Sequence, residues 1–324
     1  MLHKSDHIAK KEALVSVIVP NYNYAHFLCQ RIDTILNQTY KNIEIIILDD
    51  CSTDNSRTVI ESYRHCDKIK KIEYNSCNSG STFKQWQKGF LMAKGDFIWI
   101  AECDDYADPC FLEKIVPVMQ NDKEIKIGFS NSYWVTPEST FINHDYTISS
   151  LQKVYNGKKF VRQHLMKENY IYNASMAVFR KDALKYVDPN FINYKSCGDK
   201  LFWGSMAASG KVLYHCEPLN HFRIHSTKVT TKSIANGVLF HEEYELFKKN
   251  IQNGYITIKN RWQTVAYFQQ YVMRMKTSFL TQDIYNTCLD LWRKEADYKN
   301  KELPFLYRLL CFFKVRLNKQ RKNI

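Results

Sequence analysis

The chain has 324 residues, which is enough for one large α/β domain and an additional segment. Hydrophobic residues make up 45% and charged residues 24%, which is ordinary for a globular protein, and neither repeats nor low-complexity segments interrupt the chain. The formal net charge of +13 favours anionic partners, such as nucleotides, nucleic acid or acidic membrane surfaces.

The ten cysteines are scattered, with neither a C-x-x-C pair nor regular spacing, so they indicate neither a zinc site nor a disulfide framework. We interpret them as reduced thiols of a cytosolic protein. Residues 1–13 read as a polar tail without the apolar core of a signal peptide, and no stretch reaches the ~18 uninterrupted apolar residues of a spanning helix. A cytoplasmic location is therefore expected.

The first part of the chain alternates buried apolar runs with segments of helical periodicity. Strands are predicted at Leu14–Val19, Ile43–Leu48, Ile69–Tyr74, Phe97–Ala101 and Ile125–Trp134, and helices at Ala25–Gln38, Ser52–Tyr63, Thr82–Lys94 and Asp108–Met119. This alternation implies right-handed crossovers. The predicted fold class is therefore α/β, with a mostly parallel, Rossmann-like sheet flanked by helices.

After residue 137 the pattern is less regular. Helices are predicted at Lys158–Lys167 and Gly198–Ser209, and strands or extended segments at Ser175–Phe179, Lys211–His215 and Pro218–Arg223. From Ile234 onward the pattern is helical. We therefore expect a sheet domain over residues 14–230 and a helical C-terminal extension over residues 231–302.

Three carboxylates, Glu102, Asp104 and Asp105, directly follow the fourth predicted strand. In an open α/β sheet, ligands bind outside the carboxyl ends of the strands. A carboxylate cluster there repels itself unless a cation neutralises it, and oxygen ligands suit Mg²⁺ or Mn²⁺, which usually bridge to phosphates. The second strand delivers Asp49 and Asp50 to the same edge. This pattern favours a metal–diphosphate site over the alternative, a solvated acidic turn.

The last segment, residues 303–324, interleaves leucine, phenylalanine and valine with arginine and lysine, and no acid follows Glu302. An apolar face with a basic flank is typical of a helix that lies on an anionic membrane surface. The alternative is a C-terminal helix docked on the body, with a solvated basic tail. We expect this basic amphipathic tail to hold the protein on the inner face of the cell membrane.

Four stretches, in this order, resemble the family 2 glycosyltransferases: residues 15–23, 49–54, 93–98 and 102–105. The similarity covers roughly residues 14–226, and the combination is specific, although each motif alone is weak. The resemblance implies the GT-A fold. It also implies an inverting transfer, dependent on a divalent cation, of a sugar from a nucleotide-sugar donor to an acceptor hydroxyl.

The resemblance further implies which residues bind the nucleotide. In such enzymes these residues follow the first and second strands, and here they are Pro20, Asn21, Tyr22, Asn23, Asp49 and Asp50. Asp49 matches the position that accepts a hydrogen bond from the uracil N–H, which implies a UDP-sugar donor. Family analogy places three more residues near the donor, namely Asn78, Gly80 and Lys88. The alternatives are turn and capping chemistry for the two acids, and an exposed helix face for Lys88.

Residues 102–104 stand where the family has its D-x-D motif. Because the first acid is a glutamate, we expect Glu102 to contact the ribose or the sugar of the donor. The metal, Mn²⁺ or Mg²⁺, is assigned to Asp104, with Asp105 in support and His225 as a third ligand, although a lone histidine is more often structural. A cation bound there would offset the charge that builds on the leaving diphosphate.

Family members also carry an acid at the start of an aromatic-rich helix downstream of the D-x-D motif, and residues 196–203 fit this pattern. The usual Glu-Asp pair is Gly198-Asp199 here, so Asp199 alone is assigned as the general base that acts on the acceptor hydroxyl. A plain helix N-cap is the alternative. Arg223 is expected to contact a phosphate of the donor.

The expected activity is an inverting, metal-dependent transfer to a glycan or lipid-linked acceptor, in the synthesis of capsule, lipopolysaccharide or exopolysaccharide. A sugar nucleotidyltransferase would need a glycine-rich phosphate loop where this chain has residues 20–23. A nucleic-acid-binding protein would interleave basic and aromatic residues on one surface, so no nucleic acid partner is expected. A non-catalytic, nucleotide-sugar-binding subunit stays open, because Glu102 and the lone Asp199 depart from the family pattern.

Overall fold

The computed structural model describes residues 12–144, 152–224 and 229–297. The basic amphipathic tail and the predicted metal ligand His225 lie outside the described residues. Within the described part, no helix is long and apolar enough to cross a membrane.

The chain folds into two compact units that do not follow each other in sequence. The first unit takes in the described residues of Met1–Val154, together with Asn173–Lys185 and Lys211–Ile224. The second takes in Tyr155–Tyr172, Tyr186–Gly210 and the described residues of His225–Ile324. The boundary near residue 230 was drawn from the helical sequence pattern alone, and it stays a prediction.

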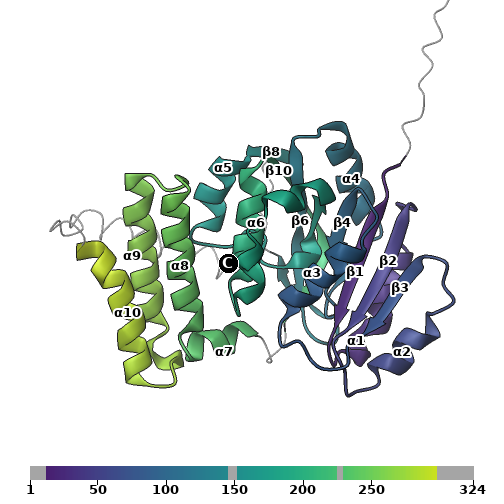
Figure 1. The fold of residues 1–324 in the computed structure, drawn as a ribbon, viewed down its shortest axis with the longest axis horizontal. Helices are drawn as coiled ribbons and strands as arrows, with labels where there is room; N and C mark the ends of the chain where they lie inside the picture. Colours follow the sequence, from purple (N-terminus) through teal and green to yellow (C-terminus); the bar gives the residue numbers. More distant parts are fainter. Residues whose placement is uncertain (1–11, 145–151, 225–228, 298–324) are drawn as a thin grey trace, which may run out of the picture. The chain divides into compact units, whose positions relative to one another are not determined.

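A mixed sheet, ten-stranded over the described residues, organises the first unit (Figure 1). Its strands in spatial order are β3 (Ile69–Tyr74), β2 (Ile43–Asp49), β1 (Val15–Asn21), β4 (Phe97–Ile100), β9 (Ala177–Arg180), β6 (Ile125–Val135), β10 (Lys211–Arg223) and β5 (Tyr106–Ala107), with β7 (Phe141–His144) on β6 and β8 (Gln152–Asn156) on β10. Strands β1 to β4 pair in parallel, whereas β9 is antiparallel to β4 and β6. The carboxyl ends of β1, β2 and β4 therefore meet at one edge.

The helices of the first unit are α1 (Ala25–Leu36), α2 (Ser56–Ser62), α3 (Thr82–Met92) and α4 (Phe111–Asn121). Strands β1, β2 and β4 are buried along their whole length, as expected for parallel strands covered on both faces. Val17 of β1 shares one apolar cluster with Ile32 of α1 and Ile115 of α4. Helix α3 approaches β1 so closely that a Cβ on Gly89 would come within 2.6 Å of Ile18 Cγ2, so a larger residue there would force the buried Ile18 side chain to move.

The second unit is mainly helical. Its helices are α5 (Gly157–Phe160), continued by a π-helical turn at Val161–Leu165, then α6 (Gly198–Ala208), α7 (Val229–Ala235), α8 (Val238–Gln252), α9 (Ile258–Arg274) and α10 (Gln282–Asp297). Figure 1 shows α8, α9 and α10 side by side. Their shared core is aromatic: Trp292 is fully buried and stacks on Phe268, with ring centroids 4.4 Å apart.

The predicted α/β sheet with a helical C-terminal region is confirmed, and among the local boundaries that differ from prediction, two have a physical explanation. The segment after Pro218 continues the strand before it, because both belong to β10, which pairs with β6 through register shifts around the proline. Proline has no N–H for the ladder, so the irregularity lets the strand continue. Helix α4 begins at Phe111, not at Asp108, whose Oδ1 accepts the N–H of Cys110.

Candidate functional site

The carboxyl ends of β1 and β2 are joined side chain to side chain. Asn21 and Asp49 are partners in the strand register, and Asn21 Nδ2 donates a hydrogen bond of 2.7 Å to Asp49 Oδ1. Ser52 donates twice to the same carboxylate, from its hydroxyl at 2.6 Å and from its N–H at 3.0 Å. Three donors fix the buried Asp49 carboxylate, which accepts about four hydrogen bonds in total and so retains one acceptor position.

The loop after β1 is pinned to the loop after β2. The Asn23 N–H donates to Ser52 Oγ over 2.9 Å, and Asn23 Oδ1 accepts the Thr53 N–H over 2.8 Å. Asn23 and Cys51 adopt left-handed backbone conformations, with φ values of 58° and 65°. Such conformations are unfavourable for residues other than glycine and concentrate at functional sites. Tyr22, which precedes Asn23 in the loop after β1, keeps 45% of its surface exposed.

The carboxylate of Asp50 is occupied by the segment that follows β3. It accepts hydrogen bonds from the side chains of Asn75 at 2.6 Å, Ser79 at 2.7 Å and Gln85 at 2.9 Å. The N–H of Ser79 adds a fourth bond of 2.9 Å. Three of these bonds fall on Oδ1 and one on Oδ2, so Asp50 holds this segment in place, and its predicted contact with the nucleotide stays a prediction.

The other residues predicted near the donor lie in this same segment or on α3. Asn78 Nδ2 donates to the Asp50 carbonyl over 3.2 Å, and its Oδ1 accepts the Gly80 N–H over 2.7 Å. Gly80 has a φ of 70°, which favours glycine. Lys88 Nζ donates to Asn75 Oδ1 over 2.5 Å, so its ammonium contacts a protein side chain, and its phosphate contact stays a prediction.

The loop after β4 carries the three predicted acids in unlike surroundings. Glu102 Oε1 accepts the indole N–H of Trp86 over 2.7 Å, and burial, reinforced by Asp104, raises the pKa of Glu102 to about 8. Asp105 is buried and accepts Asn173 Nδ2 over 2.6 Å. Burial and the neighbouring Asp104 raise the pKa of Asp105 to about 7. The three acids of this loop therefore lie close enough to disfavour one another's ionised forms.

This donor set fits a divalent cation. Among the described residues, no three His, Cys, Asp or Glu side chains are grouped as a complete metal site. However, Asp104 stands between two carboxyls whose pKa values are raised partly by its own charge, and a cation would relieve that repulsion. Cys103 Sγ donates to the Pro20 carbonyl over 3.0 Å, which fixes the acidic loop to the end of β1.

Arg223 ties the acidic loop to the rest of the first unit. It is 1% exposed, and its Nε donates to the Asp104 carbonyl over 2.6 Å. Its terminal nitrogens donate to Gln30 Oε1 over 2.7 Å and to the Thr136 carbonyl over 3.1 Å. Through these bonds Arg223 holds the acidic loop in place. Its predicted contact with a phosphate stays a prediction.

Arg31 of α1 is a second buried arginine, and it was not predicted as a site residue. Its guanidinium lies 4.7 Å from the centre of the Trp99 ring, and within the described residues none of its nitrogens has a hydrogen-bond partner. Burial lowers its pKa to about 10, a shift opposed chiefly by Asp105. The sequence did contain a signal for its burial. Arg31 lies next to Ile32 and three residues after Leu28, so it falls on the apolar face of the predicted helix.

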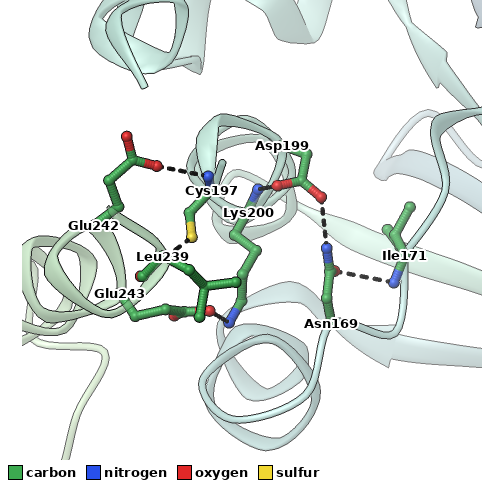
Figure 2. Close-up of polar contacts among 8 residues, drawn as sticks. All are labelled: Asn169, Ile171, Cys197, Asp199, Lys200, Leu239, Glu242 and Glu243. Carbon is green, nitrogen blue, oxygen red and sulfur yellow. Dashed lines mark hydrogen bonds and ion pairs between the residues drawn. The ribbon is translucent and has the colours of Figure 1, made fainter. Parts of the chain in front are cut away.

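Asp199 lies in the second unit, as the second residue of α6 (Figure 2). Its Oδ1 accepts the Lys200 N–H and its Oδ2 accepts Asn169 Nδ2, both over 2.8 Å. Burial raises the pKa of Asp199 to about 6. The N-cap residue of α6 is Cys197, so Asp199 is not the N-cap itself, although its carboxylate accepts an N–H of the first turn. Its carboxylate is oriented by two donors and keeps acceptor capacity on both oxygens.

Comparison with known sequences places this chain among sugar-transferring enzymes. The sequence model of glycosyl transferase family 2 matches residues 16–187. An uncharacterised glycosyltransferase of Haemophilus influenzae is 30% identical over 241 residues, which cover 73% of this chain and 71% of that protein. A putative teichuronic acid biosynthesis glycosyltransferase of Bacillus subtilis, TuaG, is 33% identical over 106 residues, or 33% of this chain and 42% of that protein.

Solved structures share the fold. Staphylococcus aureus TarS 1–349 in complex with UDP-GlcNAc has a TM-score of 0.54 and 17% identity, covering 90% of this chain and 93% of that one. The mannosyltransferase PcManGT from Pyrobaculum calidifontis, in complex with GDP-Man and Mn²⁺, has a TM-score of 0.50 and 14% identity, covering 94% and 80%. With the family match over residues 16–187, these likenesses confirm both predictions: the chain has the GT-A fold and belongs to glycosyl transferase family 2.

Proposed function

We propose that this glycosyltransferase moves a sugar from a UDP-sugar to a hydroxyl of a glycan or lipid-linked acceptor, in the synthesis of a cell-envelope polysaccharide. The observation that carries the proposal is the Asp49 carboxylate, which Asn21 and Ser52 fix at the ends of two parallel strands with one acceptor position left. Uracil presents one ring N–H donor, which matches that single position. The UDP-GlcNAc bound by TarS and the teichuronic acid role in the name of TuaG support this reading.

The remainder of the donor site is assigned to the loops after β1 and β4. The exposed ring of Tyr22 lies against the base, and Glu102 contacts the ribose or the sugar. Asp104, with support from Asp105, holds a divalent cation, as the Mn²⁺ in the PcManGT structure suggests for the fold. When bound, that cation stabilises negative charge on the diphosphate.

Asp199 is the general base in this proposal. It accepts the proton of the acceptor hydroxyl while the hydroxyl oxygen bonds to the anomeric carbon. The bond from that carbon to the diphosphate oxygen breaks, and UDP leaves with the electron pair. Attack and departure on opposite faces invert the anomeric configuration. With a pKa of about 6, the Asp199 carboxyl is mostly ionised at neutral pH and still basic enough for proton transfer.

We also propose that the basic amphipathic tail, which lies outside the described residues, holds the enzyme on the anionic inner face of the cell membrane. The support is its sequence alone, in which apolar and basic residues alternate without an acid. A lipid-linked acceptor would be presented at such a surface.

Titration calorimetry of UDP into the full-length protein, with and without Mn²⁺, tests the donor assignment. We expect UDP to bind, more tightly with Mn²⁺, and CDP to bind at least about tenfold more weakly, since the ring nitrogen of cytosine that replaces the uracil N–H carries no hydrogen and the bond to the charged group is lost. Equal affinity for UDP and CDP would contradict the role of Asp49. Absence of UDP binding in both conditions would contradict a UDP-sugar donor.

A further inference from the structure

The segment that leads into α6 presents Asp199, yet α6 lacks a side-chain cap of its own. The first N–H groups of a helix, and those of the turn before it, need acceptors from elsewhere. For the turn before α6 the acceptor comes from α8, a helix more than 40 residues further along the chain, and Figure 2 shows its contact with the Cys197 N–H. All the residues involved belong to the second unit.

Glu242 of α8 receives three backbone N–H groups in a row. The Lys195 N–H donates to Glu242 Oε1 over 2.7 Å, and the N–H groups of Ser196 and Cys197 each donate to Oε2 over 2.8 Å. Hydrogen bonds to a charged acceptor are roughly twice as strong as neutral ones. One carboxylate therefore fixes the path of the backbone up to the N-cap of α6, two residues before Asp199.

The next residue of α8, Glu243, contacts the residue that follows Asp199. Glu243 Oε1 lies 2.6 Å from Lys200 Nζ, and both side chains are at most 10% exposed. The N–H of Lys200 is also the donor to Asp199 Oδ1. Consecutive glutamates of α8 thus hold the backbone before Asp199 and the residue after it.

We propose that Glu242 is a positioning residue for Asp199, and that the α8 contact sets the geometry of the general base. The inference rests on the proposed function, in which Asp199 accepts the proton of the acceptor. Among the described residues, no hydrogen bond joins Glu242 to Asp199, so Glu242 acts through the backbone of residues 195–197. Loss of this contact displaces the base, and a displacement of about 1 Å can lower a rate by about 100-fold. The predicted nucleotide-binding residues all lie in the first unit, so donor affinity is retained.

The test uses the full-length protein and UDP release from UDP-GlcNAc, with water as the acceptor. We expect Glu242→Ala to lower kcat by about tenfold or more while KM for UDP-GlcNAc stays within about twofold. Glu242→Gln keeps one oxygen, which accepts at most two of the three N–H groups, so its rate is expected between those of wild type and Glu242→Ala. Should Glu242→Ala fail to fold, Glu242→Gln carries the same comparison.

Glu245→Ala is the matched control, because Glu245 lies on the same helix, its side chain is exposed, and its one ion pair within the described residues is with Lys248. It is expected to match the wild-type kcat. An equal loss of kcat in both variants, or a rise in KM at constant kcat in Glu242→Ala, overturns the inference.

Amide hydrogen exchange of residues 195–201 gives a readout that needs no turnover. Exchange in Glu242→Ala is expected to be about tenfold faster or more, since three N–H groups lose their acceptor. Wild-type exchange in that variant, or faster exchange with wild-type kcat, overturns the positioning role. Failure of the proposed function looks different: Asp199→Asn would then release UDP at the wild-type rate, whatever Glu242 does.

Discussion

Asn21 and Asp49 form the last register pair of β1 and β2, and the amide of one holds the carboxylate of the other over 2.7 Å. The acceptor assigned to the nucleotide base is therefore oriented by the neighbouring strand before any ligand arrives. A group fixed in its bound position loses little conformational freedom on binding, which favours affinity.

Replacing Asp49 by Asn keeps the shape of the side chain and converts one acceptor oxygen into a donor NH₂ group. We expect UDP affinity to fall about 10- to 100-fold, since a hydrogen bond to a charged group contributes roughly 1.5–3 kcal/mol. Titration calorimetry with UDP measures the change. An Asp49→Asn variant with wild-type affinity would exclude Asp49 from the nucleotide site.

Asp104→Ala is expected to abolish the strengthening of UDP binding by Mn²⁺, because the carboxylate between Glu102 and Asp105 is the proposed metal ligand. UDP affinity in the variant should then be the same with and without Mn²⁺. Asp96→Ala is the matched control, because Asp96 is an exposed aspartate just before β4, at the opposite end of that strand. Mn²⁺ dependence retained in Asp104→Ala would move the metal elsewhere.

The pH profile of transfer follows the ionisation of Asp199. Burial raises the pKa of this carboxyl to about 6, and only its ionised form accepts a proton. The kcat is therefore expected to be level above pH about 7 and to fall about tenfold for each pH unit below 6. Steady-state measurements of kcat between about pH 4.5 and about pH 8 give the profile.

Asp199→Asn should remove this limb of the profile together with the activity, while UDP affinity is retained. An active variant with the wild-type pH dependence would assign the base to another residue.

Arg223→Ala is expected to destabilise the protein by about 3 kcal/mol, because several acceptors, among them the Asp104 carbonyl and Gln30, lose a buried charged donor. Urea unfolding measures the change in the free energy of unfolding. Arg64→Ala removes an exposed arginine paired with Glu61, and it should leave the free energy of unfolding close to that of the wild type. Wild-type stability with weakened UDP binding in Arg223→Ala would instead favour the predicted phosphate contact.

Deletion of residues 303–324 is expected to release the protein from anionic vesicles at low salt, since the segment carries apolar and basic side chains without an acid. Co-sedimentation with vesicles of phosphatidylglycerol and phosphatidylcholine measures the loss. Equal binding by the full-length and shortened proteins would favour a tail docked on the body.

The strands that carry the site could be predicted because their signal is local. The buried runs of β1, β2 and β4 are continuous in sequence, and parallel pairing brings their ends together. The acids that follow the second and fourth strands were therefore assigned to one edge of the sheet, and the structure places Asp49 and Asp104 at the ends of β2 and β4, both neighbours of β1.

The partners of the site residues could not be predicted, because they are distant in sequence. Arg223 meets Gln30 across 193 residues, and Asp105 meets Asn173 across 68. The four donors that occupy Asp50 come from a loop and a helix whose polar residues have no periodic pattern. Arg31 did leave a trace, as a cation within an apolar helical face, but its position beside the acidic loop depends on tertiary packing.

The division into units also limits where this protein can be truncated or divided into separate domains. Between Val154 and Lys211 the chain passes from one unit to the other four times, so neither unit is a continuous piece of sequence. A fragment that stops near residue 230 would keep α6 but lack α8, and with it the acceptors for the segment before Asp199. Truncation or domain exchange at that point is thus expected to give an aggregating fragment, and proteolytic nicking between Val154 and Lys211 should disrupt both units at once.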